Sequence, residues 1–129
     1  MLRTTARYLL IALLVAAGAA HLSWGRRGYR IAVPDWAVRL LRTNKDTIVL
    51  VSGAAELVLA AAIAAAPRPV TAVAVASFFV AVFPGNVHHW RTGRSVPMMR
   101  TDRSRFVRLL LQPVLVAWAL WSVPSRWRR

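Results

Sequence analysis

The chain alternates between long apolar stretches and shorter polar, basic segments. Four apolar stretches approach the length of a membrane span: residues 8–23, 47–66, 70–87 and 106–123. A hydrocarbon core about 30 Å thick takes roughly 17–25 helical residues. The pattern predicts an all-α protein, a bundle of four transmembrane helices in one integral membrane domain, residues 1–129. The first and third stretches are short, so we expect local thinning of the bilayer around them.

The same stretches argue against a soluble helical bundle. A helix on the surface of a soluble protein carries a polar face at 3.6-residue spacing. Between Val70 and Phe83 the only polar side chains are Thr71 and Ser77, and residues 57–66 have none. These helices are therefore predicted to face lipid.

The connections between the stretches differ in length. Residues 67–69 form a turn in which two prolines stop the second and third helices from running together. The connections at 24–46 and 88–105 are long and rich in arginine. Within the first of them, residues 34–41 predict a short interfacial helix that begins at a proline. Pro84-Gly85 predicts a break late in the third helix.

The first stretch also has the features of a secretory signal peptide. Arg3 and Arg7 precede the apolar run, and Ala17-Gly18-Ala19 resembles a small-residue cleavage site. Cleavage there would leave three spans and remove the helix that carries His21. We expect the segment to be retained as the first span, with cleavage as the alternative.

Composition narrows the classes of function. The chain is 57% hydrophobic and has no cysteine, which excludes disulfides, thiolate metal sites and thiol catalysis. Its formal net charge of +14 would be typical of a nucleic-acid-binding domain. The basic residues, however, lie between lipid-soluble stretches and lack interleaved stacking aromatics. We therefore predict contact with anionic lipid of the bilayer and no nucleic-acid partner.

The distribution of basic residues predicts the orientation. The two long connections, together with Arg108, hold 12 of the 18 basic residues, and the termini and the short turn hold the other six. By the positive-inside rule, the long connections face the cytoplasm and both termini lie outside.

Polar residues inside the predicted spans are the candidates for a site. A charged side chain at the bilayer centre costs about 2.5–3.5 kcal/mol on insertion scales, so it is expected to face protein or water. Because the helices alternate in direction, four of these residues fall in the same half of the bilayer: His21, Glu56, Asn86 and Gln112. We predict that they form one ligand-binding site, with Arg108 turned toward Glu56 or snorkelling to the surface. No catalytic residue is predicted.

Each candidate also has a purely structural alternative. Glu56 and Gln112 would make hydrogen bonds between helices, which contribute only about 0.6 kcal/mol on average and need no ligand. His21 would close the end of its helix, and Asn86 would cap the broken one. The adjacent histidines at 88 and 89 would point about 100° apart on a helix, so no metal site is predicted.

Five short patterns occur in the order found in a known family. They are Gly18-x-x-His21, Ile31-x-Val33-Pro34-x-Trp36, Ser52-Gly53-x-x-Glu56-Leu57, Phe83-Pro84-x-Asn86 and Arg108-x-x-x-Gln112. On these patterns the chain resembles the DoxX and DoxX-like family of small four-helix membrane proteins over about residues 8–121. Two features depart from the family. The usual Pro-Ala-Asn-Ile-Tyr-Met run reads Pro-Gly-Asn-Val-His-His at 84–89, and Leu110 replaces a frequent proline.

The resemblance implies a multi-pass protein of a bacterial cytoplasmic (inner) membrane. It also implies an association with quinone-linked oxidases or with thiosulfate and thiol redox systems. The missing cysteines, and the lack of an evident haem-type histidine pair, argue against transferring redox catalysis to this chain.

Three functions remain open at this point. The favoured one is a membrane protein without independent catalysis, whose polar cluster binds a small ligand, lipid or quinone head, or fixes a partner subunit. The second is a quinone-linked oxidoreductase subunit in which Glu56 and His21 move protons and quinone is the cofactor. The third is a small proton-coupled carrier. A bound redox cofactor would favour the oxidoreductase subunit. Uptake by vesicles that depends on Glu56 would favour the proton-coupled carrier.

Overall fold

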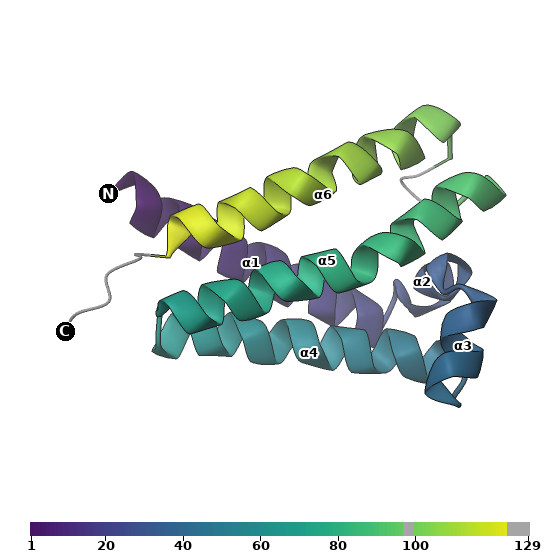
Figure 1. Ribbon diagram of the computed structural model, residues 1–129, viewed down its shortest axis with the longest axis horizontal. Helices are drawn as coiled ribbons and strands as arrows, with labels where there is room; N and C mark the ends of the chain where they lie inside the picture. The colour runs from purple at the N-terminus through teal and green to yellow at the C-terminus, as the bar shows by residue number, and fades with distance from the viewer. Residues whose placement is uncertain (97–99, 124–129) are drawn as a thin grey trace.

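The computed structural model describes residues 1–96 and 100–123. This part of the chain folds into six helices and contains no β-strand, which confirms the all-α prediction (Figure 1). The helices are α1 (Leu2–Leu22), α2 (Arg26–Ala32), α3 (Asp35–Leu41), α4 (Lys45–Ala65), α5 (Pro69–Thr92) and α6 (Asp102–Ser122).

Three of these helices, α1, α4 and α5, are long and apolar enough to cross a membrane. The length and composition of these three helices indicate a membrane protein. Helix α6 is also 21 residues long but is not in this set. Its first half carries Arg103, Arg105 and Arg108, which lower its apolar character. The prediction of four such spans is corrected to three for the described residues.

The helices are longer than the apolar stretches that predicted them. Helix α1 begins at Leu2 rather than at residue 8, and α6 begins at Asp102 because the Thr101 side chain caps it, accepting from the Ser104 N–H at 3.1 Å. Helix α5 runs through Pro84 to Thr92 without a break. The predicted interruption was wrong, and so was the expectation that the first and third spans are short.

The long helices pack as two pairs. Helix α1 lies along α4, and α5 lies along α6, with sparser contacts between the pairs. Buried residues of all four helices, including Leu14, Ile63, Val75 and Ala119, form one core. In Figure 1 the short helices α2 and α3 lie at one end of the bundle, and the start of α1 and the end of α6 lie at the other.

Helices α1 and α4 approach most closely at Gly18 and Gly53. A Cβ atom at Gly53 would lie 2.6 Å from the Cβ of His21 and 3.0 Å from the Gly18 carbonyl oxygen. A Cβ at Gly18 would lie 2.9 Å from the Gly53 carbonyl oxygen. Small residues allow such close approach in membranes. The contact sets His21 directly against α4.

The first long connection forms two short helices, of which only α3 was predicted. Helix α2 is anchored to α4 by Arg26, whose Nε donates to the Asp46 carboxylate at 2.6 Å. It also reaches α5, where a Cβ at Gly85 would lie 3.1 Å from the Ala32 carbonyl oxygen. Helix α2 therefore bridges the two helix pairs at the end of the bundle that carries the long connections.

Candidate functional site

The first predicted pair lies between α1 and α4. His21 Nδ1 is 3.1 Å from Glu56 Oε2, and the two side chains are only 13% and 9% exposed. The same Nδ1 lies 2.7 Å from the Ala17 carbonyl oxygen. A carbonyl only accepts, so Nδ1 carries the proton and donates it there. The Glu56 carboxylate therefore sits beside this N–H, close to the loop end of the bundle.

Two further residues surround the imidazole. The ring of Tyr29, on α2, stacks on that of His21 with centroids 3.6 Å apart and an interplanar angle of 14°. The guanidinium Cζ of Arg108, on α6, lies 6.0 Å from the Tyr29 ring centroid. Burial raises the pKa of the Tyr29 phenol above its ordinary value of 10.0, so this group keeps its O–H at neutral pH. The sequence analysis did not anticipate Tyr29.

The second predicted pair lies between α5 and α6. Asn86 Nδ2 donates to Gln112 Oε1 at 3.0 Å, and Gln112 Nε2 donates to the Phe79 carbonyl at 2.6 Å. Both amides are buried. Asn86 therefore sits inside a continuous helix and does not cap a broken one. This arrangement agrees with the structural alternative for Gln112.

The four predicted residues thus form two separate pairs. In the described ranges, no hydrogen bond or ion pair joins His21 or Glu56 to Asn86 or Gln112. Each pair holds together the two helices that pack most closely, α1 with α4 and α5 with α6. The predicted cluster of four residues is therefore not formed. The space open to a ligand lies between the helix pairs α1–α4 and α5–α6.

A cavity of about 250 Å³ occupies part of this space. We call it the inner cavity. His21, Tyr29, Ser52 and Arg108 supply its polar wall. Its apolar wall comes from α3, α4 and α5 and includes Trp36, Leu40, Val49, Ala81, Val82 and Pro84. Of the five predicted site residues, only His21 and Arg108 line it.

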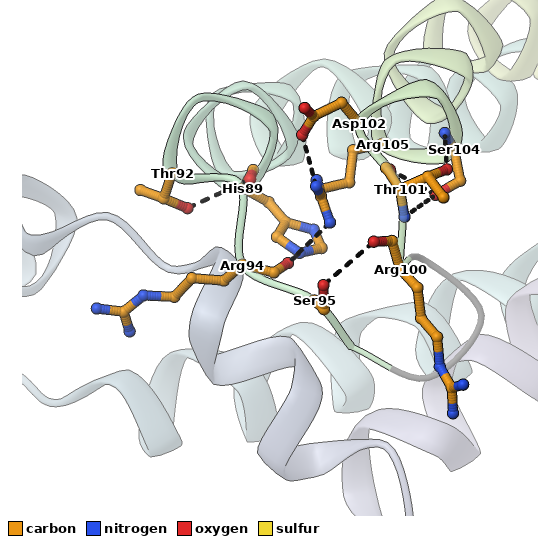
Figure 2. Close-up of polar contacts among 9 residues, drawn as sticks. All are labelled: His89, Thr92, Arg94, Ser95, Arg100, Thr101, Asp102, Ser104 and Arg105. Atoms are coloured by element: carbon orange, nitrogen blue, oxygen red, sulfur yellow. Dashed lines mark hydrogen bonds and ion pairs between the residues drawn. The ribbon is translucent and has the colours of Figure 1, made fainter.

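A second polar cluster closes the connection between α5 and α6 (Figure 2). His89 Nε2 donates to the Arg94 carbonyl oxygen at 2.8 Å, and Arg105 Nη1 donates to the same oxygen at 3.3 Å. Arg105 Nη2 also contacts the Asp102 carboxylate at 2.5 Å. His89 and Arg105 are almost fully buried. Their contacts are to the backbone and to a neighbouring turn, as expected for a structural cluster.

No described group of three or more His, Cys, Asp and Glu side chains is placed to hold a metal ion. The sequence analysis assigned His89 to the connection at 88–105. In the structure it lies in α5, and its Nε2 donates to the Arg94 carbonyl oxygen.

Gln112→Leu is expected to destabilise the α5–α6 pair. The change removes both Gln112 hydrogen bonds and leaves the Asn86 amide buried without its acceptor, which costs about 1–3 kcal/mol. The double variant Asn86→Leu/Gln112→Leu removes both polar groups and should recover part of this loss. The free energy of unfolding is measured by titrating sodium dodecyl sulfate into the protein in dodecyl maltoside micelles, with circular dichroism as the readout of helix content. Equal stability of wild type and Gln112→Leu would contradict the assigned hydrogen bonds.

These features define an α-helical membrane protein whose polar residues join helices in pairs and flank a small cavity. The chain belongs to a family described as a domain of unknown function (DUF8561), whose model matches residues 10–123. No curated protein and no solved structure matches the chain.

The family match overturns the resemblance to DoxX proteins. The five patterns that suggested it are built from small residues, prolines and polar side chains at helix contacts. Gly18 and Gly53, for example, serve the close approach of α1 and α4, a need shared by many membrane bundles. The expected redox association loses its basis with the resemblance. The bacterial cytoplasmic membrane stays a prediction.

Proposed function

We propose that this chain is an integral membrane protein without a catalytic centre of its own, which binds the polar head of a small membrane-soluble ligand in the inner cavity. The observation that supports this most is the meeting of His21, Tyr29 and Arg108, from three different helices, at the wall of a largely apolar cavity. Apolar cavities with a few convergent polar groups are the usual form of small-molecule sites.

The size and chemistry of the inner cavity favour a ring-sized head with oxygen acceptors. Its volume of about 250 Å³ is just below the roughly 300–1,000 Å³ of sites that enclose a whole drug-sized ligand. Arg108 carries N–H donors and Tyr29 an O–H donor. An apolar tail would leave past α3, where Leu40 and Leu41 are exposed. A quinone head has these properties and is the ligand class to test.

Helix α6 completes the bundle as a fourth membrane-embedded helix in this proposal. It packs along α5 and turns Arg105 and Gln112 inward, while Leu110, Val114 and Trp121 are exposed on it. Polar side chains inside a bilayer normally face protein in this way. The long connections would then share one side of the membrane, which the positive-inside rule makes the cytoplasmic side.

Ala81→Leu is expected to weaken quinone binding by about tenfold. Ala81 lines the inner cavity, so a leucine side chain there would occupy part of the volume that the quinone head needs, and a loss of about 1.4 kcal/mol of binding free energy is tenfold in affinity. The probe is a short-chain benzoquinone titrated into the purified protein, with tryptophan quenching as the readout, because Trp36 also lines the cavity. Trp36→Phe should remove most of the signal.

The matched control is Ala74→Leu, two helical turns earlier on α5, at an exposed position that does not line the inner cavity. It should bind like wild type. Equal affinities of wild type and Ala81→Leu, or no saturable quenching at all, would reject the quinone assignment. The remaining hypothesis would then be that a partner subunit covers the inner cavity.

A proton-coupled carrier is the second candidate. The carboxylate of Glu56 lies next to the N–H of His21, and His21 lines the inner cavity. Proton movement into reconstituted vesicles that Glu56→Gln abolishes would select this function over simple binding.

A further inference from the structure

A larger cavity of about 760 Å³ opens between α2 and α6. We call it the α2–α6 groove. Tyr29 and Arg108 line both it and the inner cavity, so these two residues stand where the cavities meet. The groove lies at the end of the bundle with the long connections, which carry most of the positive charge of the chain.

One part of the groove is basic. Arg27 from α2 and Arg103 from α6 line it, both exposed, together with Thr101 and Ser104. No acidic residue is among its lining residues. Two helices therefore each bring an arginine to the same opening.

The chain has no acid left to neutralise these arginines. It contains only four Asp and Glu residues, and every one already has a basic partner. The pairs are Glu56 with His21, Asp46 with Arg26, Asp35 with Lys45, and Asp102 with Arg105. Among the described residues, no side-chain carboxylate is paired with Arg27 or Arg103, so both arginines are available to an anion from outside the chain.

The other part of the groove is apolar and is aligned with the basic part along α6. Arg103, Val107 and Leu111 follow one another at four-residue spacing, so they lie on one face of the helix. At 1.5 Å per residue, Leu111 is about 12 Å further along the axis than Arg103. Val107 and Leu111 are both exposed. Trp24, at the groove wall, is of the type enriched at membrane interfaces.

We propose that the α2–α6 groove binds one anionic phospholipid, with its phosphate between Arg27 and Arg103 and an acyl chain along Val107 and Leu111. A lipid phosphate with its attached acyl chain matches a charged rim that leads directly into an apolar wall. The site goes beyond the proposed function, because it does not depend on what the inner cavity binds.

The test is native mass spectrometry of the full chain released from mixed micelles that contain phosphatidylglycerol and phosphatidylcholine in equal amounts. Wild type is expected to retain one phosphatidylglycerol. Arg27→Gln/Arg103→Gln should weaken this retention by roughly 25-fold, from about fivefold for each arginine near an anionic lipid. Equal retention of the two lipids by wild type would overturn the proposal.

The control variant is Arg39→Gln/Arg91→Gln. Both arginines are exposed and belong to α3 and α5, and neither lines the groove. The total charge falls by the same amount as in the test variant. If both double variants lose phosphatidylglycerol equally, binding reflects net charge alone and the proposed site is wrong.

A second arm separates a lipid from a free phosphate. Inorganic phosphate added to wild type should not displace phosphatidylglycerol if the acyl chain contributes to binding. Leu111→Gln should weaken lipid retention while circular dichroism confirms that it is folded. Complete displacement by phosphate would show a simple anion site and overturn the lipid assignment. Quinone titration of Arg27→Gln/Arg103→Gln should match wild type, so the two proposals can fail separately.

Discussion

Gly53→Ala is expected to lower the free energy of unfolding by about 3 kcal/mol, at the upper end of the usual cost of overpacking. The added Cβ would lie 2.6 Å from the Cβ of His21 and 3.0 Å from the carbonyl oxygen of Gly18. Both atoms belong to, or are directly attached to, the α1 backbone, so no rotation of a side chain relieves the contact. Helices α1 and α4 must move apart.

The measurement is unfolding by sodium dodecyl sulfate in dodecyl maltoside micelles, followed by circular dichroism. Gly28→Ala is the matched control, because its Cβ would lie 3.7 Å from the nearest atoms, those of Val96, an ordinary contact distance. Gly28 is inside α2, and alanine there should leave stability unchanged or raise it by about 0.4–1 kcal/mol. Unaltered stability of Gly53→Ala would show that α1 and α4 do not approach as described.

Local properties of the sequence were sufficient to predict the membrane class and the helices α1, α4 and α5. Each is a long apolar segment, and hydropathy depends only on the residues in it. Helix α6 was predicted as a fourth span from residues 106–123, but it is not apolar enough to belong to the candidate spans, because arginines lie in its first half. Arg105 is buried with contacts to Arg94 and Asp102, and only the tertiary structure shows where such a side chain goes.

The break predicted at Pro84 failed because the rule behind it is also local. Proline removes one N–H and crowds the carbonyl four residues earlier, here that of Val80. In the structure Gln112 donates to the adjacent Phe79 carbonyl, and α6 packs along this part of α5. A contact from a residue far along the chain thus lies one residue from the carbonyl that the proline affects, and a rule that considers α5 alone does not include it.

The sequence singled out polar residues inside the helices, but it did not show which of them lie together or that only His21 and Arg108 line the inner cavity. Alternating helix direction predicted that His21, Glu56, Asn86 and Gln112 form one site, whereas the structure pairs His21 with Glu56 and Asn86 with Gln112. The pairing of these polar residues depends on which helices are neighbours in the bundle. The hydropathy of each segment does not contain this information. Tyr29 escaped notice because α2 is short and has few apolar residues, so nothing in its segment indicated that an aromatic ring would stack on His21.

Removal of the His21 imidazole is the second change with a large expected effect. His21→Ala should lower the free energy of unfolding by about 3 kcal/mol, because loss of one partner of a buried pair leaves the other uncompensated. Glu56 is the partner here, 3.1 Å away. Glu56→Gln keeps the shape and removes the charge, and Glu56 Oε2 accepts no hydrogen bond from the described residues, so its cost should be only about 1 kcal/mol.

A double-mutant cycle separates this pair from general damage to α1 and α4. His21→Ala and Glu56→Ala should each be costly, and the double variant should cost less than their sum by about 1–3 kcal/mol, as is found for residues in direct contact. Ser52→Ala, one turn before Glu56 on α4, is the control for truncation of a polar group on the same helix. Strictly additive costs would mean that His21 and Glu56 are only neighbours. The stacked Tyr29 and the inner cavity beside them would then be held in place by helix packing alone.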